Sequence, residues 1–297
     1  MLAQQILNGL IVGSVYALFS LGFTLIFGVM NIMNLAHGAI FTCGAFVGLY
    51  AILMLELPPW VALVLAVLAG GLVSAVVDYL CFRPLRSRRV DEFGPIVASI
   101  GAGLVLISLS QQVSDAKILG FPFGTFPVVI YKFAGLRISL LQLSVVGCTA
   151  LLVGALVYYL YGTSFGRQVR AVAVNEQTAR LLGINPDRIY LQIFFIAGAM
   201  AGAAGLIIGL AFNTVHFLMG EPMMLRAFVV VILGGLGSIL GAVVAGLLLG
   251  IVQTLLVAYV SSQLSDAILF SILFVALLVR PTGLFRGLRL DVKVGRQ

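Results

Sequence analysis

Charged residues are scarce in this sequence. They make up 9% of its 297 residues, whereas hydrophobic residues make up 62%. A soluble domain carries about 25% charged and roughly 45–50% apolar residues, so a water-soluble fold would leave much of this apolar surface exposed to water. The composition therefore excludes a soluble enzyme and indicates a protein embedded in lipid.

Lysine is rarer still. The chain contains only Lys117, Lys132 and Lys293, and none of them follows a glycine-rich loop of the form GxxxxGK[ST]. Because a P-loop uses that lysine to contact the phosphates of ATP, the sequence predicts no ATP-binding P-loop. Gly235 and Gly237 have the spacing of a dinucleotide fingerprint, but they lie among apolar residues with no strand before them, which argues against a Rossmann site.

Cysteine and acidic residues are also few. Cys43, Cys81 and Cys148 lie far apart, without CxxC spacing, so no metal site is predicted. Acidic residues such as Glu56 and Asp266 fall near the ends of apolar segments, which argues against a proton relay or a sodium site. No Ser-His-Asp or paired-carboxylate pattern is present. We expect no catalytic residues, no metal and no cofactor.

Long apolar segments dominate the chain instead. A membrane-spanning helix needs ~20 apolar residues, and segments near that length lie at 6–29, 38–55, 60–80, 93–109, 138–160 and 189–212. The segment 226–260 is too long for one span and is interrupted by glycines, and 266–279 is short. The sequence predicts an all-α integral membrane protein with a single transmembrane domain over 1–297. We expect a bundle of about eight to nine transmembrane helices, some of them broken.

Basic residues indicate how the chain is oriented. Thirteen of the 17 Lys and Arg residues fall in the segments 83–89, 167–188 and 280–296. Because loops rich in Lys and Arg face the cytoplasm, we expect these segments inside and the N terminus outside. The clustering also argues against a surface that binds nucleic acid.

Two irregular segments interrupt the apolar pattern. One interpretation of the polar cluster after the first span is a capped helix start with a buried, hydrogen-bonded histidine. The alternative is a solute pathway, because polar groups inside a membrane are costly unless they pair or line a cavity. A helix that begins there can also direct free N–H groups at a carboxylate. The predicted pathway residues are Asn31, Asn34, His37, Gly38, Gly234, Gly235, Gly237 and Ser238.

The same two regions suggest an internal repeat. In 31–48 and in 217–250, a break follows a span and leads into a helix with regularly spaced glycines. Because the first and the sixth spans run in opposite directions, the repeat would be inverted, as in many transporters.

The inside segment 162–188 predicts a short amphipathic helix at the membrane face. Val169 and Ala179 are apolar, Arg180 is charged, and Gly183 offers a C-terminal stop.

Five sequence motifs occur in order along the chain. They are NLAHGAIF at 34–41, FRPLRS at 82–87, GRQVRAVAVNEQTARLLGIN at 166–185, LGGLGSILGAVVAGLLLGI at 233–251 and RPTGLF at 280–285. With these motifs the chain closely resembles, nearly end to end, the permease subunits of bacterial ABC importers for branched-chain amino acids. The resemblance implies a multi-pass protein of the bacterial inner membrane that moves such amino acids into the cytoplasm and is not itself an enzyme.

The resemblance also implies partners: a second permease subunit, either a paralogue or another copy, two cytoplasmic ATPase subunits and an external substrate-binding protein. In such importers a cytoplasmic loop docks into the ATPase, and the loop within 162–188 occupies that place. The coupling residues are then Val174, Asn175, Glu176, Ala179, Leu182 and Gly183. The general importer pattern has Glu-Ala-Ala, whereas Gln177 and Thr178 follow Glu176 here, so position and amphipathicity carry the docking role.

Other functions remain open at this point. Similar permeases serve urea or short amides, and an uncoupled channel or an ion-driven carrier would be a different class of transporter. A neighbouring gene for a P-loop ATPase favours the importer, whereas full transport by this chain alone favours the channel or the carrier.

Overall fold

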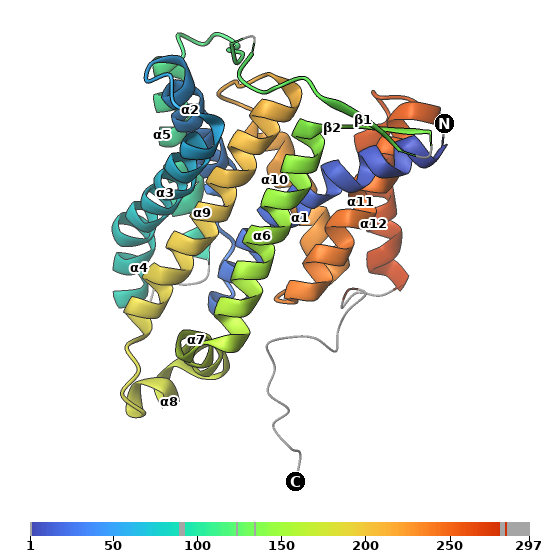
Figure 1. The fold of residues 1–297 in the computed structure, drawn as a ribbon. Coiled ribbons are helices and arrows are strands. Elements are labelled where there is room, and N and C mark those ends of the chain that lie inside the picture. The colour runs from blue at the N-terminus through green and yellow to red at the C-terminus, as the bar shows by residue number, and fades with distance from the viewer. Residues whose placement is uncertain (1, 89–92, 123, 134, 280–282, 284–297) are drawn as a thin grey trace.

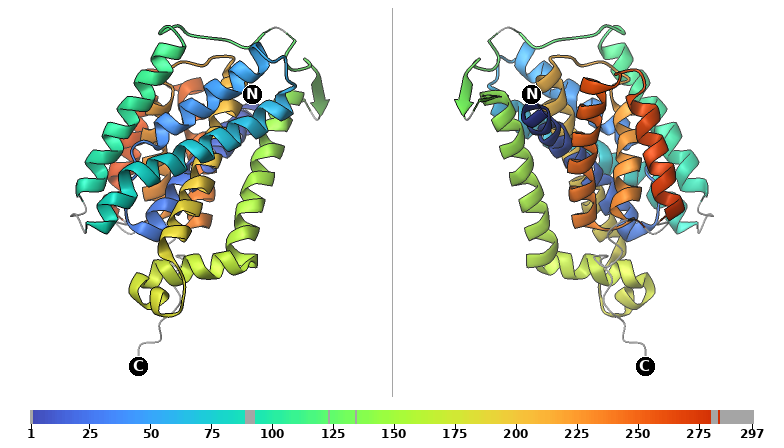
Figure 2. Two further views of the ribbon diagram at one scale, coloured as in Figure 1. Left: turned by 90° about the vertical axis from the view of Figure 1, so that its left-hand side faces the viewer. Right: turned by 90° about the vertical axis from the view of Figure 1, so that its right-hand side faces the viewer.

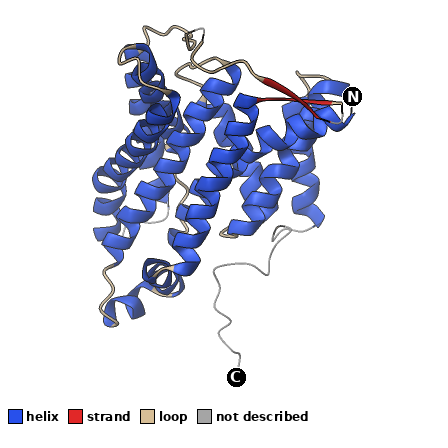
Figure 3. Cartoon of the chain, in the orientation of Figure 1, coloured by secondary structure: helices blue, strands red, loops and turns tan. Residues whose placement is uncertain are grey.

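The computed structural model describes residues 2–88, 93–122, 124–133, 135–279 and 283. These residues form helices almost throughout, with one short pair of strands (Figure 3). The helices pack side by side into one bundle (Figure 1). The prediction of an all-α membrane bundle is therefore confirmed.

Six helical segments among the described residues are long and apolar enough to cross a membrane. They are α1 (Leu2–Met30), α3 with its continuation (Pro59–Ser87), α5 (Phe93–Val113), α6 (Leu140–Gly162), α9 (Pro186–Phe212) and α11 (Ile239–Tyr259). Two shorter apolar helices, α2 (His37–Leu53) and α12 (Ser265–Val279), run with them. Together with α10 (Gly220–Gly234), they match the predicted bundle of about eight to nine helices.

Capping residues set several of the helix bounds. α6 begins at a capping box, in which the Gln142 N–H donates to Ser139 Oγ (3.1 Å) and the Ser139 N–H donates to Gln142 Oε1 (3.0 Å). α9 begins with Pro186 directly after the capping residue Asn185, and it ends at Asn213, which has a left-handed backbone. These local signals place the span boundaries within a few residues of those expected from hydropathy.

Two basic segments lie at one end of the bundle. α3 (Pro59–Val77) continues through a π-helical turn, η1 (Asp78–Phe82), into α4 (Arg83–Ser87), and α6 leads into α7 (Ser164–Val174) and α8 (Glu176–Leu181). Figure 1 shows α4, α7 and α8 at the same end, as the charge pattern predicts. The third basic segment lies almost wholly outside the described residues.

The opposite end carries the N terminus and a β-hairpin (Figure 2). β1 (Ile130–Phe133) pairs antiparallel with β2 (Leu136–Ser139). The Gln4 side chain accepts from the Arg137 N–H and donates to the Arg137 carbonyl, both at 2.9 Å, which ties the start of α1 to the hairpin. The strands contain β-branched and aromatic residues, such as Ile130, Tyr131 and Ile138, which favour extended backbone.

Glycines bring two pairs of helices into close contact. Gly13 of α1 lies against the backbone of Gly246 in α11, and Gly202 of α9 lies against Gly70 of α3. Small residues allow this approach, because packing rather than the hydrophobic effect holds helices together in lipid. α1 is followed by a break, α2 and α3; α9 is followed by a break, α10 and α11. Since α1 and α9 run in opposite directions (Figure 1), the arrangement is that of the predicted inverted repeat.

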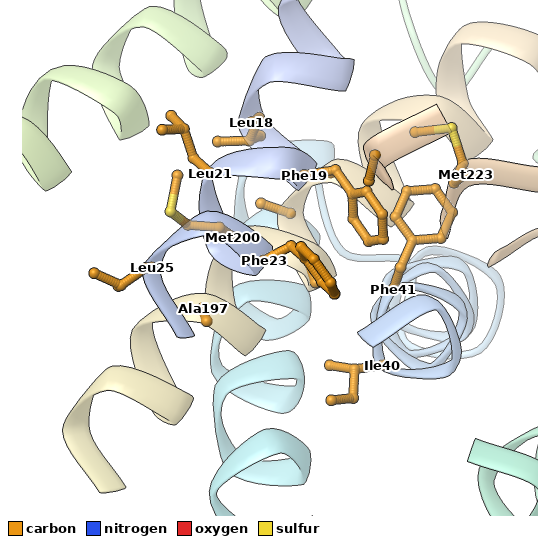
Figure 4. Close-up of a cluster of buried hydrophobic side chains, with 14 of the residues drawn as sticks. Leu18, Phe19, Leu21, Phe23, Leu25, Ile40, Phe41, Ala197, Met200 and Met223 are labelled. Atoms are coloured by element: carbon orange, nitrogen blue, oxygen red, sulfur yellow. The ribbon is translucent and has the colours of Figure 1, made fainter. Parts of the chain in front are cut away.

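α1 lies in the centre of the bundle. Leu18, Phe19 and Leu21 are 0% exposed, and the side chains of α1 point to both sides of the helix, toward Phe41 and toward Met200 (Figure 4). A helix that is apolar all round is a buried helix. α1 therefore forms the core around which the other helices pack.

Substitution of Gly202 tests this packing. Gly202→Leu should lower the free energy of unfolding by about 1–3 kcal/mol or more, because overpacking displaces neighbouring backbone and α3 leaves no room for a side chain there. The matched control is Gly147→Leu on α6, where nothing lies within 4 Å of an added Cβ. Thermal unfolding in detergent measures both. A wild-type melting temperature for Gly202→Leu would contradict the packing described.

Candidate functional site

The predicted polar break lies between α1 and α2. Asn34 and His37 are both 0% exposed, whereas Asn31 is exposed. Asn34 Oδ1 accepts from the Ala36 N–H at 3.1 Å, and His37 Nε2 lies 3.2 Å from the Phe19 carbonyl oxygen. The Asn34 Nδ2 and His37 Nδ1 atoms have no hydrogen-bond partner among the described residues. One atom of each side chain thus lies unpaired inside an apolar bundle, among the described residues.

The N-termini of the two half-length helices meet beside this break. Gly38, in the first turn of α2, contacts the backbone of Gly220, the first residue of α10. Neither helix has a side-chain cap, so the first-turn N–H groups of both leave partial positive charge at the junction. The contact is tight enough that no side chain fits at either glycine. The junction is closed in this conformation.

The predicted glycine run forms the turn between α10 and α11, at the other end of α10. Gly235 (φ 94°) and Gly237 (φ 80°) have left-handed backbones, which only glycine adopts without strain. Ser238 caps α11 by accepting from the Gly241 N–H at 3.1 Å. Gly234, Gly235, Gly237 and Ser238 are all buried, and Gly237 packs on Gly28 near the end of α1. The structure brings Asn34, His37 and Gly38 together and places this turn close to the end of α1 that precedes Asn31.

The predicted amphipathic helix is two helices joined at Asn175. Asn175 has an extended backbone (φ −159°), and its side chain caps α8 by accepting from the Thr178 N–H at 2.9 Å. The expectation of one helix is corrected here, because a capping asparagine starts a new helix. Gly183 follows the end of α8 with φ 82°, as the stop signal predicts. The Ala179 side chain of α8 is buried, whereas Leu182, directly after the helix, is 73% exposed.

α7 is anchored on α6 rather than free. The Arg170 Nη1 atom donates to the Leu160 carbonyl at 2.6 Å, at the end of α6. Thr163 caps α7 by accepting from the Gly166 N–H at 3.4 Å. α7 is therefore held against the end of α6.

A polar network that the sequence analysis did not identify connects α8 to α3. Glu176 Oε1 lies 2.7 Å from Arg180 Nη2, and this hydrogen bond and the charge of Glu176 raise the pKa of Arg180. The Tyr190 hydroxyl of α9 donates to Glu176 Oε2 at 3.0 Å. The Arg86 guanidinium stacks 4.7 Å from the centre of the Tyr190 ring. α8, α9 and α4 thus meet through three side chains.

The network ends at a buried ion pair in the π-helical turn. Arg86 Nη1 lies 2.6 Å from Asp78 Oδ1, and the Asp78 side chain is 1% exposed. Asp187 at the start of α9 lies 3.9 Å from Arg86 Nη2. An aspartate within an apolar segment, eight residues before an arginine, was the available sequence signal. The role of Tyr190 had none, because its contacts join residues far apart in the chain.

A family model described as "Branched-chain amino acid transport system / permease component" matches residues 5–278 of this chain. The chain belongs to this family. It is 32% identical over 292 residues to the high-affinity branched-chain amino acid transport system permease protein LivH of Escherichia coli (strain K12), which covers 95% of this chain and 94% of the relative. It is 31% identical to the corresponding protein BraD of Pseudomonas aeruginosa, with the same coverage.

A more distant relative is the probable branched-chain amino acid transport permease protein LivH of Methanocaldococcus jannaschii, at 28% identity over 95% of this chain and 92% of the relative. The family match and the six spanning helices make this chain a multi-pass permease of the inner membrane.

The Asp78–Arg86 pair gives a stability prediction. Arg86→Gln should destabilise the protein by about 3–5 kcal/mol, because it leaves a buried carboxylate without its partner. The double variant Arg86→Gln/Asp78→Asn should recover most of that loss, because no unpaired charge remains. Thermal unfolding in detergent compares the two. Equal melting temperatures for the single variant and the wild type would contradict the buried pair.

Proposed function

We propose that this permease is the transmembrane subunit of an ABC importer that moves branched-chain amino acids into the cytoplasm. Two separate cytoplasmic ATPase subunits supply the energy, and a second permease subunit and an external binding protein complete the importer. The observation that carries the proposal is the family match over 5–278, together with relatives named for high-affinity transport of these amino acids. The chain itself hydrolyses nothing, in keeping with the absence of a P-loop from its sequence.

The proposed ATPase-docking surface is α7–α8, on the cytoplasmic side. Val174, Leu181 and Leu182 are 53%, 88% and 73% exposed. These apolar side chains lie on a basic element outside the spanning helices, and exposed apolar residues beside charged ones are typical of a protein-binding site. The shape of this element is set by Asn175, Glu176, Ala179 and Gly183. The Glu176–Tyr190–Arg86 network supports the transmission of movement from α8 to α3 and α9.

The proposed solute pathway runs past the junction of α2 and α10. Asn31, Asn34, His37 and Gly38 form one side of it, and the turn formed by Gly234, Gly235, Gly237 and Ser238 forms its inner end. Two uncapped helix N-termini favour a carboxylate, and the two helices meet there through the backbones of Gly38 and Gly220. The pathway opens when α2 and α10 move apart.

The decisive experiment is uptake into proteoliposomes that contain the purified complex, with its binding protein outside and ATP inside. We expect ATP-dependent uptake of leucine and no uptake of urea. ATP-dependent uptake of urea or a short amide in place of leucine would support the alternative permease, and uptake driven by an ion gradient without ATP would support a carrier. Either result overturns the proposal.

The docking surface gives a second test. Leu181→Glu should weaken binding of the ATPase subunits at least tenfold, because a charge replaces an exposed apolar side chain that would be buried in the complex. The matched control is Val128→Glu, because Val128 is 91% exposed and lies just before β1, next to the hairpin at the opposite end of the bundle. Co-purification and leucine-stimulated ATP hydrolysis are the measurements. The surface is assigned wrongly if both variants retain the ATPase equally.

A further inference from the structure

A cleft opens beside the α2–α10 junction. It has a volume of about 660 Å³ and lies between α1, α10 and α11, with the segment 213–219 along one edge. Its apolar walls include Val12, Ile208, Met219, Met223 and Val257. Met219 and Met223 flank Gly220, so the cleft adjoins the proposed pathway.

The floor of this cleft is polar. Arg226 of α10 lines it. Asp266 of α12 lies just beyond the lining and pairs with Arg226, with 3.3 Å between Nη2 and Oδ1. The Arg226 guanidinium also lies 5.8 Å from the centre of the Tyr16 ring, and the Tyr16 hydroxyl donates to Gln253 Oε1 at 2.7 Å. The buried Arg226 Nε has no partner among the described residues.

The cluster extends from the core of the bundle to its surface: Tyr16 is 3% exposed, whereas the side chains of Arg226 and Asp266 are 24% and 54% exposed. Tyr16 is at the midpoint of α1 (Leu2–Met30), a helix long enough to span the membrane. A charged side chain within a membrane bundle is costly, and one that faces a cavity, as Arg226 does, marks a solute or ion pathway. A purely structural role explains little, because an ion pair with an exposed partner contributes little to stability.

The chemistry of the floor and walls matches one class of solute. A guanidinium binds a carboxylate through two parallel hydrogen bonds, and an aspartate can accept from an ammonium group. The apolar walls suit an aliphatic side chain. We propose that this cleft binds the transported amino acid as its zwitterion, with the carboxylate at Arg226, the ammonium at Asp266 and the side chain against Met219 and Met223. This inference rests on the proposed function of the permease.

The affinity of such a site is low, because a transport site must release its solute. Binding is therefore measured by saturation-transfer NMR, with millimolar L-leucine and the permease–ATPase complex in nanodiscs without the binding protein. Leucine should bind the wild type. Leucinamide, which lacks the carboxylate, and 4-methylvalerate, which lacks the ammonium, should each bind at least tenfold more weakly. If the wild-type protein binds no leucine, or binds all three compounds equally, the inference is wrong.

The variant Arg226→Gln/Asp266→Asn removes both charges and keeps two amides that can hydrogen-bond. It should assemble and unfold like the wild type but lose at least tenfold in leucine affinity. The matched control is Lys117→Gln/Asp115→Asn, which neutralises an exposed pair (3.5 Å, with side chains 70% and 78% exposed) and should bind leucine normally. If the first variant binds leucine with wild-type affinity, the inference is wrong, and the Arg226–Asp266 pair serves only to join α10 to α12.

Uptake assays separate the two ways of being wrong. If the complete wild-type importer takes up leucine and the Arg226→Gln/Asp266→Asn importer does so at the same rate, the site is wrong and the proposed function stands. If the complete wild-type importer takes up no leucine, the proposed function itself is wrong.

Discussion

The architecture depends on one constraint: a backbone N–H or C=O group left unpaired in lipid costs several kcal/mol. α2 and α10 both begin inside the bundle, after irregular segments whose backbone groups cannot face lipid. α1 and α9, the two most buried of the six long helices, enclose these segments. The close approach of Gly38 to Gly220 lets the two helix starts shield each other. The broken helices, the central position of α1 and the glycine contacts therefore follow from the same requirement.

The placement of polar side chains follows from it as well. Asp78 and Asp266 each lie beside an arginine, which is the arrangement that makes a charge tolerable away from water. Asn34 and His37 differ, because no charged side chain pairs with them among the described residues, and each keeps one atom without a hydrogen-bond partner there. These atoms lie beside two uncapped helix starts, which supports the proposed solute pathway at this junction.

The sequence was enough to predict the membrane spans, the breaks between them and the location of two basic segments at the same end of the bundle. Each of these features depends on the length, hydropathy or positive charge of a short stretch of chain. The split of the coupling element at Asn175 was missed, since the surrounding residues continue a helical pattern and only the extended backbone reveals the cap. Neither the contact of Tyr190 with Arg86 nor that of Tyr16 with Gln253 could be predicted, because those pairs form only once the helices cross. Arg226 was visible, but its partner on α12 was not.

We propose that the α2–α10 junction is closed at rest and opens during transport. The first-turn amides of α2, at Gly38 and Ala39, have no intrahelical acceptor and no side-chain cap, so their hydrogen exchange reports chiefly on access of water. Hydrogen–deuterium exchange by mass spectrometry on the importer in nanodiscs measures it directly. We expect slow exchange at rest and at least tenfold faster exchange during ATP turnover with loaded binding protein. Equal exchange in both states, in a complex that is importing solute, would contradict it.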